Sequence, residues 1–424
     1  MSTDVESPLR RTLMPRLRRS HRSSAAERRG YNAALHAGFP MSRSPSRWLL
    51  LAFVLTCAPG SVLAQTMPAA AVPPPPIAAK AYVLVDTLSG QTLVAQGADE
   101  PREPASLTKL MTAYIAFRAL KDKELTPSQM VTVSEKAWRA EGSRMFIEPK
   151  KAVSVDELLR GEIVQSGNDA AIALAEAVSG SEEAFVVRMN QEATRLGMKN
   201  TRFSNATGLP SPQHVSSAAD LARVAAAIIK DFPEYYPLYA LKEYRYNNIT
   251  QANRNRLLWT DPFVDGMKTG FTDAAGYCLI ASAKRGPRRL VSVVLGAGSD
   301  AARASESQKL LNYGFQFYDT VQLYQNGQSV TALKVWKGAT DSVAAGFVAD
   351  QYVTLPKGQA PKLKLTLEAV EPLIAPVTLG QRVGVVKVTL DDKPIGQYPL
   401  QALSEVEPAG FFGRMWGTVR LWFH

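Results

Sequence analysis

The spacing of apolar residues changes three times between residues 81 and 320, and these changes limit the possible fold more than any other feature. Two short runs with a strand pattern, 81–86 and 91–96, are joined by a turn-like Thr-Leu-Ser-Gly. Apolar residues then recur at helical spacing from Ser106 to about Ile229. Strand patterns return in "GYCLIASAKRGPRRLVSVVLGAG", and "ARASESQKLLNYGFQFY" follows with a helical one. The order predicts an α+β domain over 81–320, an antiparallel sheet with a helical cluster.

A different pattern begins at about residue 321. Short strand-like runs alternate with Gly, Pro and Asp turns up to about residue 405, without His, Cys or a cluster of catalytic groups. We expect a small all-β domain over 321–405 that positions or tethers the chain. Segment 406–424 carries aromatic residues at helical spacing, which favours an amphipathic helix lying in a membrane surface. A terminal helix docked on its own domain is the alternative.

The first eighty residues are expected to lie outside both domains. Residues 41–64 combine two arginines, an apolar run and a small-residue cleavage site, which is the pattern of a secretory signal peptide. This interpretation makes 1–40 an over-extended N-terminus and 65–80 a Pro/Ala linker, and it predicts export to the periplasm. A lipid on Cys57 is the competing interpretation, and the preceding Thr56 disfavours it.

Charge, cysteine and histidine counts exclude several kinds of function. Of the net charge of +11, residues 1–64 contribute seven charges, because they hold ten Arg and three acidic residues. The remainder is too weakly basic for a nucleic-acid surface. Cys278 is the single cysteine after the signal segment, so no internal disulfide is expected. His214 is the single histidine in 81–320, which argues against a Ser-His-Asp triad or a zinc site, and no metal or organic cofactor is implied.

Three short motifs occur in order within the predicted α+β domain. Ser106-x-x-Lys109 opens the first helical pattern, Ser166-Gly167-Asn168 joins two helical patterns, and Lys268-Thr269-Gly270 precedes the returning strands. Each motif alone has an ordinary explanation: a serine as a helix cap, an asparagine in a turn, a lysine as a solvated charge. The combination S-x-x-K, S-x-N and K-T-G is specific, and it is shared by penicillin-binding proteins and β-lactamases.

The residue types suggest a division of chemical roles. Residues three apart lie on one helix face, so Lys109 can reach the Ser106 hydroxyl. A lysine is a poor base at its ordinary pKa of about 10.4, but burial and the nearby charge of Lys268 would lower that pKa. We therefore expect Ser106 to be a nucleophile and Lys109 its base. Ser166 can relay a proton to a leaving amine, and Asn168 can bond the substrate backbone.

The K-T-G stretch is expected to hold the other end of the substrate. Lys268 and Thr269 would bind a terminal carboxylate, and the strand edge continuing through Gly270 offers backbone pairing to an extended peptide. The backbone N–H groups of Ser106 and Phe271 would form an oxyanion hole.

From about Ala81 to its end the chain resembles the low-molecular-mass penicillin-binding proteins, the serine-type D-alanyl-D-alanine carboxypeptidases. Supporting stretches are "GMKNTRFSNATGL", "NNITQANRNRLLW", "VDGMKTGFTDAAGYCLIAS" and "ESQKLLNYGFQFYDTV". The resemblance implies a β-lactamase/transpeptidase-like domain that removes the terminal D-Ala of peptidoglycan pentapeptides through an acyl-enzyme. It further implies covalent inhibition by β-lactams and peripheral attachment to the outer face of the inner membrane.

Two details of the resemblance leave alternatives open. Arg254 and Arg303 would steer the substrate carboxylate, although a structural ion pair explains them equally well. The best-known members have His after K-T-G, where this chain has Phe271. A backbone N–H role is compatible with Phe, whereas a role for imidazole in deacylation would predict slower or pH-shifted turnover.

Three other functions compete with the carboxypeptidase hypothesis. A serine β-lactamase shares the acylation chemistry, but class A enzymes use S-D-N with a separate Glu for deacylation. An endopeptidase of peptidoglycan cross-links shares all three motifs, and the β domain favours the carboxypeptidase. A membrane-tethered scaffold with an inactive site is the alternative that is not an enzyme, and the intact motif residues argue against it.

Overall fold

The computed structural model describes residues 72–422, and side-chain placement extends to residue 418. The predicted N-terminal segment 1–40, the signal peptide 41–64 and the first part of the linker lie outside the described residues. Residues 72–80 have no regular secondary structure. Ile77 and Ala79 from this stretch pack against a buried apolar cluster of the sheet.

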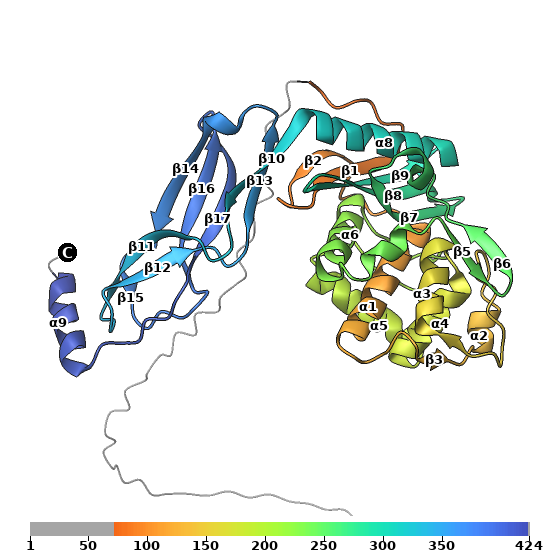
Figure 1. Ribbon diagram of the computed structural model, residues 1–424, viewed down its shortest axis with the longest axis horizontal. Helices are drawn as coiled ribbons and strands as arrows, with labels where there is room; N and C mark the ends of the chain where they lie inside the picture. Colours follow the sequence, from red (N-terminus) through yellow and green to blue (C-terminus); the bar gives the residue numbers. More distant parts are fainter. Residues whose placement is uncertain (1–71, 423–424) are drawn as a thin grey trace, which may run out of the picture. The chain divides into compact units, whose positions relative to one another are not determined.

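The first domain is built on a five-stranded antiparallel sheet with the order β2-β1-β9-β8-β7 (Figure 1). Its strands are β1 (Ala81–Asp86), β2 (Thr92–Gln96), β7 (Val264–Thr272), β8 (Gly276–Arg285) and β9 (Arg288–Ala297). β1 pairs with β9, so the start and the end of the domain meet in the middle of the sheet. β8 and β9 are covered on both faces, which explains their nearly continuous apolar runs.

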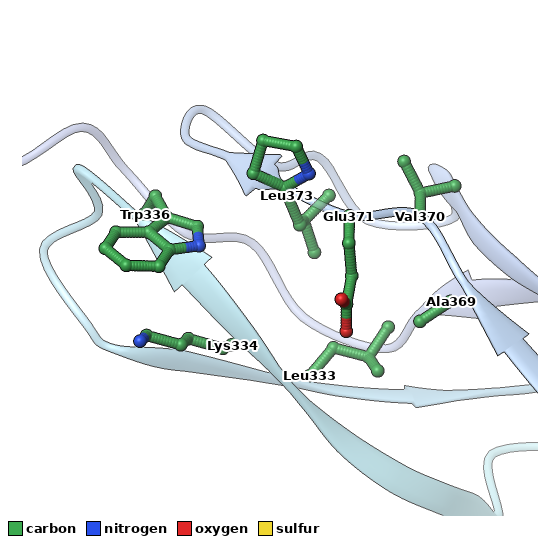
Figure 2. A pocket seen from close by; sticks show the side chains of 8 residues that line it. Leu333, Lys334, Trp336, Ala369, Val370, Glu371 and Leu373 are labelled. Carbon is green, nitrogen blue, oxygen red and sulfur yellow. The ribbon is translucent and has the colours of Figure 1, made fainter. Parts of the chain in front are cut away.

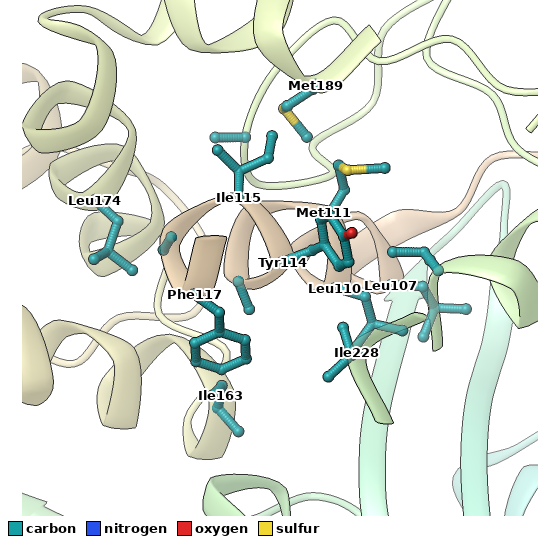
Figure 3. Close-up of a cluster of buried hydrophobic side chains, with 14 of the residues drawn as sticks. Leu107, Leu110, Met111, Tyr114, Ile115, Phe117, Ile163, Leu174, Met189 and Ile228 are labelled. Atoms are coloured by element: carbon teal, nitrogen blue, oxygen red, sulfur yellow. The ribbon is translucent and has the colours of Figure 1, made fainter. Parts of the chain in front are cut away.

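A cluster of helices covers one face of this sheet, and α8 (Asp300–Phe317) covers the other (Figure 1). The cluster contains α1 (Lys109–Lys121), α3 (Val155–Val164), α4 (Asn168–Ser179), α5 (Glu182–Arg195) and α6 (Ala218–Asp231). Helix α1 is buried nearly all round, which is typical of a helix at the centre of a domain. Figure 3 shows its side chains among those of the neighbouring helices. Smaller elements complete the domain: β3 (Met130–Val131), α2 (Glu135–Trp138), β4 (Val153–Ser154), η2 (Tyr236–Ala240), β5 (Glu243–Tyr246), β6 (Ile249–Ala252) and α7 (Leu257–Thr260).

The second domain is all β. Strands β10 (Tyr318–Tyr324) and β13 (Gln351–Pro356) form a pair, and six further strands form a sheet with the order β14-β16-β17-β12-β11-β15. These are β11 (Ser329–Trp336), β12 (Ser342–Gly346), β14 (Leu363–Ala369), β15 (Leu373–Ile374), β16 (Arg382–Leu390) and β17 (Lys393–Ala402), with a short η3 (Ala360–Lys362) before β14. The predicted α+β class and the all-β domain are thus confirmed; the exact domain limits remain predictions.

A cavity of about 380 Å³ opens in the β domain between β11 and the segment before β15. Figure 2 shows Trp336 and Lys334 beside Leu333, with Glu371 between Val370 and Leu373. None of the residues that line it belongs to the three sequence motifs.

Helix α9 (Phe411–Trp422) follows the β domain, within the predicted terminal segment. Its aromatic and apolar side chains Phe411, Phe412, Met415 and Trp416 are exposed. Within residues 72–422, we find no helix long and apolar enough to cross a membrane.

Candidate active site

Ser106 lies in a 3-10 turn, η1 (Ala105–Thr108), that runs directly into α1. The prediction of a regular helix from Ser106 is therefore wrong in its first turn. In a 3-10 turn, side chains three apart lie almost directly above one another, which brings Lys109 over Ser106. The interpretation of Ser106 as a helix cap is also wrong, because Pro104 and Thr108 occupy the cap positions of η1 and α1.

The turn is held in an unusual backbone conformation. Ala105 has a φ of 48°, in the left-handed region, and Gly208 approaches it so closely that a Cβ there would lie 1.8 Å from the Ala105 carbonyl oxygen. Thr108 Oγ1 donates to that same carbonyl at 2.8 Å and lies 2.8 Å from His214 Nε2. Strain of this kind is typical of functional sites that the surrounding structure holds in place.

His214 is part of this support. Its Nδ1 accepts from the backbone N–H of Ser204 at 3.1 Å, so Nε2 carries the proton that it donates to Thr108. Burial, with a smaller effect of the Lys109 charge, lowers the pKa of His214 to about 4. The histidine therefore stays neutral and fixes the turn.

Lys109 Nζ is fully buried and has three oxygen neighbours. It lies 3.2 Å from Ser106 Oγ, 2.6 Å from Asn168 Oδ1 and 2.7 Å from the Thr207 carbonyl oxygen. The amide and carbonyl oxygens can only accept, so they take two N–H bonds of the amine. In a neutral amine, the remaining lone pair then faces the Ser106 hydroxyl.

The electrostatic surroundings favour that neutral form. Burial lowers the pKa of Lys109 to about 7; Glu162 acts in the opposite direction, and Arg254 lowers the pKa further. A substantial fraction of Lys109 is thus a free amine at neutral pH.

The S-x-N motif lies where α3 ends and α4 begins. Ser166 has a φ of 64°, and its buried Oγ makes no hydrogen bond within the described part of the chain. Ser166 does not cap α4, because Gly167 is the N-cap residue. Asn168 Nδ2 donates to the Glu141 carbonyl at 2.6 Å, which orients its Oδ1 toward Lys109.

Asp169 also holds this region, although none of the three motifs includes it. Its carboxylate accepts the backbone N–H groups of Met145, Phe146 and Ile147 at 2.8–3.2 Å. The loop over 145–147 is thereby fixed beside the start of α4. The available signal was an acidic residue in the first turn of a mainly apolar helix.

The K-T-G motif lies on β7, the last strand of the sheet, with one edge unpaired in the sheet order. Gly270 faces the serine turn: a Cβ there would lie 3.2 Å from the Ser106 backbone nitrogen and 3.2 Å from the Pro104 carbonyl oxygen. Glycine at this position lets the strand approach the Ser106 N–H without a tight Cβ contact. The Phe271 side chain is exposed, and its ring contacts Tyr277 at 4.4 Å between centroids.

Lys268 is buried beside the serine turn. Its Nζ donates to the Thr269 carbonyl oxygen at 3.1 Å. Burial, followed by the charge of Lys109, lowers its pKa well below the ordinary value, while Glu162 opposes this shift. The candidate active site therefore contains two buried amines, those of Lys109 and Lys268.

The two arginines occupy different environments. Arg303 is buried, and its guanidinium donates to the carbonyl oxygens of Gly270 at 3.1 Å and Cys278 at 3.4 Å, and pairs with Asp300. These contacts brace β7 and β8 and favour the structural alternative for Arg303. Arg254 is exposed, and its positive charge is one of those that lower the pKa of Lys109.

Cys278 is buried and forms no disulfide within the described residues. In the described range 72–422, no three His, Cys, Asp or Glu side chains are grouped as a metal site requires.

The fold and the site together define a domain in which a serine and a lysine at the head of a central helix face the edge strand of an antiparallel sheet. Known proteins are similar to this chain in sequence over most of its length. The D-alanyl-D-alanine carboxypeptidase family (peptidase S11) matches residues 68–299, and the C-terminal domain of penicillin-binding protein 5 matches residues 318–408.

Two relatives illustrate the similarity. The chain is 44% identical to D-alanyl-D-alanine carboxypeptidase DacC of Escherichia coli K12 over 382 residues, 88% of this chain and 94% of that protein. The crystal structure of penicillin-binding protein 5 from Haemophilus influenzae superimposes with a TM-score of 0.76 at 43% identity, over 79% of this chain and 99% of that one. The chain belongs to the D-alanyl-D-alanine carboxypeptidase family, which confirms the predicted family and enzyme class.

A third comparison involves a bound antibiotic. Penicillin-binding protein D2 of Listeria monocytogenes, in its ampicillin-bound form, superimposes with a TM-score of 0.54 at 32% identity, over 58% of this chain and all of that one.

Proposed function

We propose that this protein removes the terminal D-Ala from peptidoglycan pentapeptides through an acyl-enzyme on Ser106. The observation that supports this most directly is the surroundings of Lys109 Nζ. Two acceptor oxygens occupy its N–H bonds, and Ser106 Oγ lies 3.2 Å away as the third neighbour. A base positioned in this way can take the serine proton as the serine attacks.

In the acylation step, Ser106 Oγ attacks the carbonyl carbon of the penultimate D-Ala, and its proton passes to Lys109. The backbone N–H groups of Ser106 and Phe271 stabilise the oxyanion. The C–N bond then breaks, and the leaving D-Ala amine receives a proton through Ser166. Water hydrolyses the ester and regenerates the Ser106 hydroxyl.

The edge of β7 binds the substrate in this proposal. An extended peptide pairs with the strand backbone, while Lys268 and Thr269 hold the terminal carboxylate. Asn168 bonds the peptide backbone opposite, and Arg254 at the surface attracts the anionic end. β-Lactams carry a carboxylate and a reactive carbonyl in a similar arrangement, so they should acylate Ser106.

We further propose that residues 41–64 direct the chain to the periplasm and that α9 attaches it to the outer face of the inner membrane. The exposed Phe411, Phe412, Met415 and Trp416 support an interfacial helix, because aromatic side chains favour the headgroup region. The catalytic domain then works close to newly made peptidoglycan.

The test is D-Ala release from a muropeptide ending in D-Ala-D-Ala, using residues 65–424. Ser106→Ala should abolish release, whereas Ser305→Ala, an exposed serine on α8, should match the unaltered protein. Absence of release from folded, unaltered protein would refute the carboxypeptidase proposal. Cross-linked muropeptide and penicillin would then distinguish an endopeptidase, a β-lactamase and an inactive scaffold.

A further inference from the structure

Glu162 is an ionisable residue on a face of α3 that is otherwise apolar. This face continues through Val155, Leu158 and Leu159, all buried, and Glu162 itself has an exposed fraction of 0%. Neither carboxylate oxygen has a hydrogen-bond partner among the described residues. Buried carboxylates normally have such partners, so this one needs an explanation.

The backbone places Glu162 under the S-x-N motif. After α3 the chain folds back so that the Gly167 N–H donates to the Gly161 carbonyl at 3.1 Å. Ser166 therefore lies over the helical turn that contains Glu162. Its Oγ is likewise buried without a hydrogen bond inside the described region.

The titratable groups that interact with Glu162 come from three elements. Burial raises the pKa of Glu162 to about 8, and the charges of Lys268 on β7 and, less strongly, of Lys109 on α1 oppose this shift and favour the anionic form. Tyr239 on η2 is the third titratable group, and its hydroxyl is also buried and unbonded within the described residues. A Cβ on Gly266 would lie 3.3 Å from Tyr239 Cβ, so this tyrosine packs against β7 two residues before Lys268.

Other charges nearby act on the lysines. Asp169 of α4 raises the pKa of Lys109, and Arg254 lowers the pKa of both Lys109 and Lys268. Arg303 lowers the pKa of Lys268 as well. Apart from Glu162, the charged groups that act on Lys268 are therefore cations, and each of them disfavours its positive charge.

The proposed reaction requires the two lysines in opposite charge states. Lys109 must be a free amine to accept the serine proton, and Lys268 must be a cation to bind a carboxylate. Burial disfavours charge on both side chains, and each lysine lowers the pKa of the other. A buried anion that interacts more strongly with Lys268 than with Lys109 resolves this conflict.

We propose that Glu162 is a positioning residue of this site, a buried counter-charge that keeps Lys268 cationic for the substrate carboxylate while Lys109 remains a free amine. This inference rests on the carboxypeptidase function proposed above. When Glu162 is anionic and Lys268 cationic, the three groups have no net charge. The substrate carboxylate then stabilises the cation further.

The test compares D-Ala release by the full-length protein with that of Glu162→Gln, which removes the charge and keeps the shape. Without the carboxylate, positive charge on both lysines is less stable, so both pKa values fall. The KM for the D-Ala-D-Ala peptide at pH 8 should rise by up to about tenfold, which is the limit that a fall of one pKa unit sets on the charged fraction of Lys268. The acid limb of kcat/KM should move to lower pH.

Glu162→Asp keeps the charge and should restore the KM and most of the pH profile. Glu306→Gln is the matched control, since Glu306 is a buried glutamate on α8 that bonds Lys309 and the Ala78 N–H. A wild-type KM and pH profile in Glu162→Gln would overturn the inference, as would the same changes in Glu306→Gln. If Glu162→Gln does not fold, Glu162→Asp provides the test. Since this variant keeps the charge, a rise in KM and a shift of the acid limb as large as those predicted for Glu162→Gln would overturn the inference. An inactive wild-type protein would instead refute the proposed function.

Discussion

The two domains differ in how many polar and charged side chains they bury. Among residues 72–418, buried polar and charged side chains gather in the α+β domain, and in the β domain Thr354 alone belongs to this class. The first domain buries Lys109, Lys268, Glu162 and Arg303 around one turn and one strand edge. Burying such charges costs free energy, so they persist where they serve chemistry.

In the β domain the ion pairs lie at the surface. Lys387 pairs with Glu368 and Lys362 with Asp391, and all four side chains are more than a third exposed. Its core consists of apolar residues from β11, β12, β13, β16 and β17. This domain can therefore be stable without any of the electrostatic compensation that the first domain requires.

The largest expected effect comes from removing the base. Lys109→Met should lower acylation of Ser106 about 10³- to 10⁴-fold, because the serine proton then has no acceptor. Stability should be kept or raised, since a buried amine is replaced by an apolar side chain of similar length. Stopped-flow acylation by a chromogenic penicillin measures the rate, and Lys121→Met, at an exposed position on the same helix, is the control.

The pH dependence of the unaltered enzyme checks the same group. The pKa of Lys109 is lowered to about 7, and the free amine is the active form. The acylation rate should therefore fall about tenfold per pH unit below 7 and level off above it. A flat profile between pH 5 and 8 would contradict the assignment of Lys109 as the base.

A smaller loss is expected from Gly270→Ala. The added Cβ would lie 3.2 Å from the Ser106 nitrogen and would displace the strand from the oxyanion-binding N–H. We expect kcat/KM to fall about 10²-fold, the effect of losing one oxyanion-hole donor. Gly298→Ala is the matched control, because a Cβ there has no heavy atom within 4 Å. Equal activities of the two variants would mean that β7 does not need its close approach.

His214 should couple stability of the α+β domain to pH. Its pKa is depressed to about 4 in the folded state, below the ordinary 6.5, so its contribution is complete above pH 6.5 and is lost as the pH falls toward 4. The loss can reach about 3 kcal/mol. Urea unfolding should show His214→Gln destabilised at pH 7, with a smaller gap at pH 4.5. Gln213→Ala, exposed next to it, should behave like the unaltered protein at both pH values.

The smallest effect is expected in the β domain. Lys387→Met removes one partner of an exposed ion pair and should change the free energy of unfolding by about 0.5 kcal/mol or less. A double-mutant cycle with Glu368→Gln measures the pair itself. A coupling energy of several kcal/mol would contradict the conclusion that surface ion pairs contribute little to the stability of the β domain.

Local sequence patterns determined much of this protein. The alternation of strand and helix patterns gave the α+β class and the all-β domain, because apolar periodicity reflects the faces that an element buries. The three motifs predicted Ser106, Lys109, Ser166, Asn168 and Lys268 as candidate site residues, since their residue types and order are rarely combined by chance. Composition also excluded a disulfide in the α+β domain, because one cysteine has no partner.

Tertiary structure decided what surrounds each motif. The 3-10 turn at Ser106 depends on Gly208 and His214, which lie about a hundred residues further along the chain. The lowered pKa of Lys109 depends on burial, and the Thr207 carbonyl accepts one of its N–H bonds; neither is visible in S-x-x-K. Glu162 is one of three acids in its helical pattern, and only folding brings it within electrostatic range of two lysines. Local spacing encodes local structure, but charge states depend on every group that folding brings within a few ångströms.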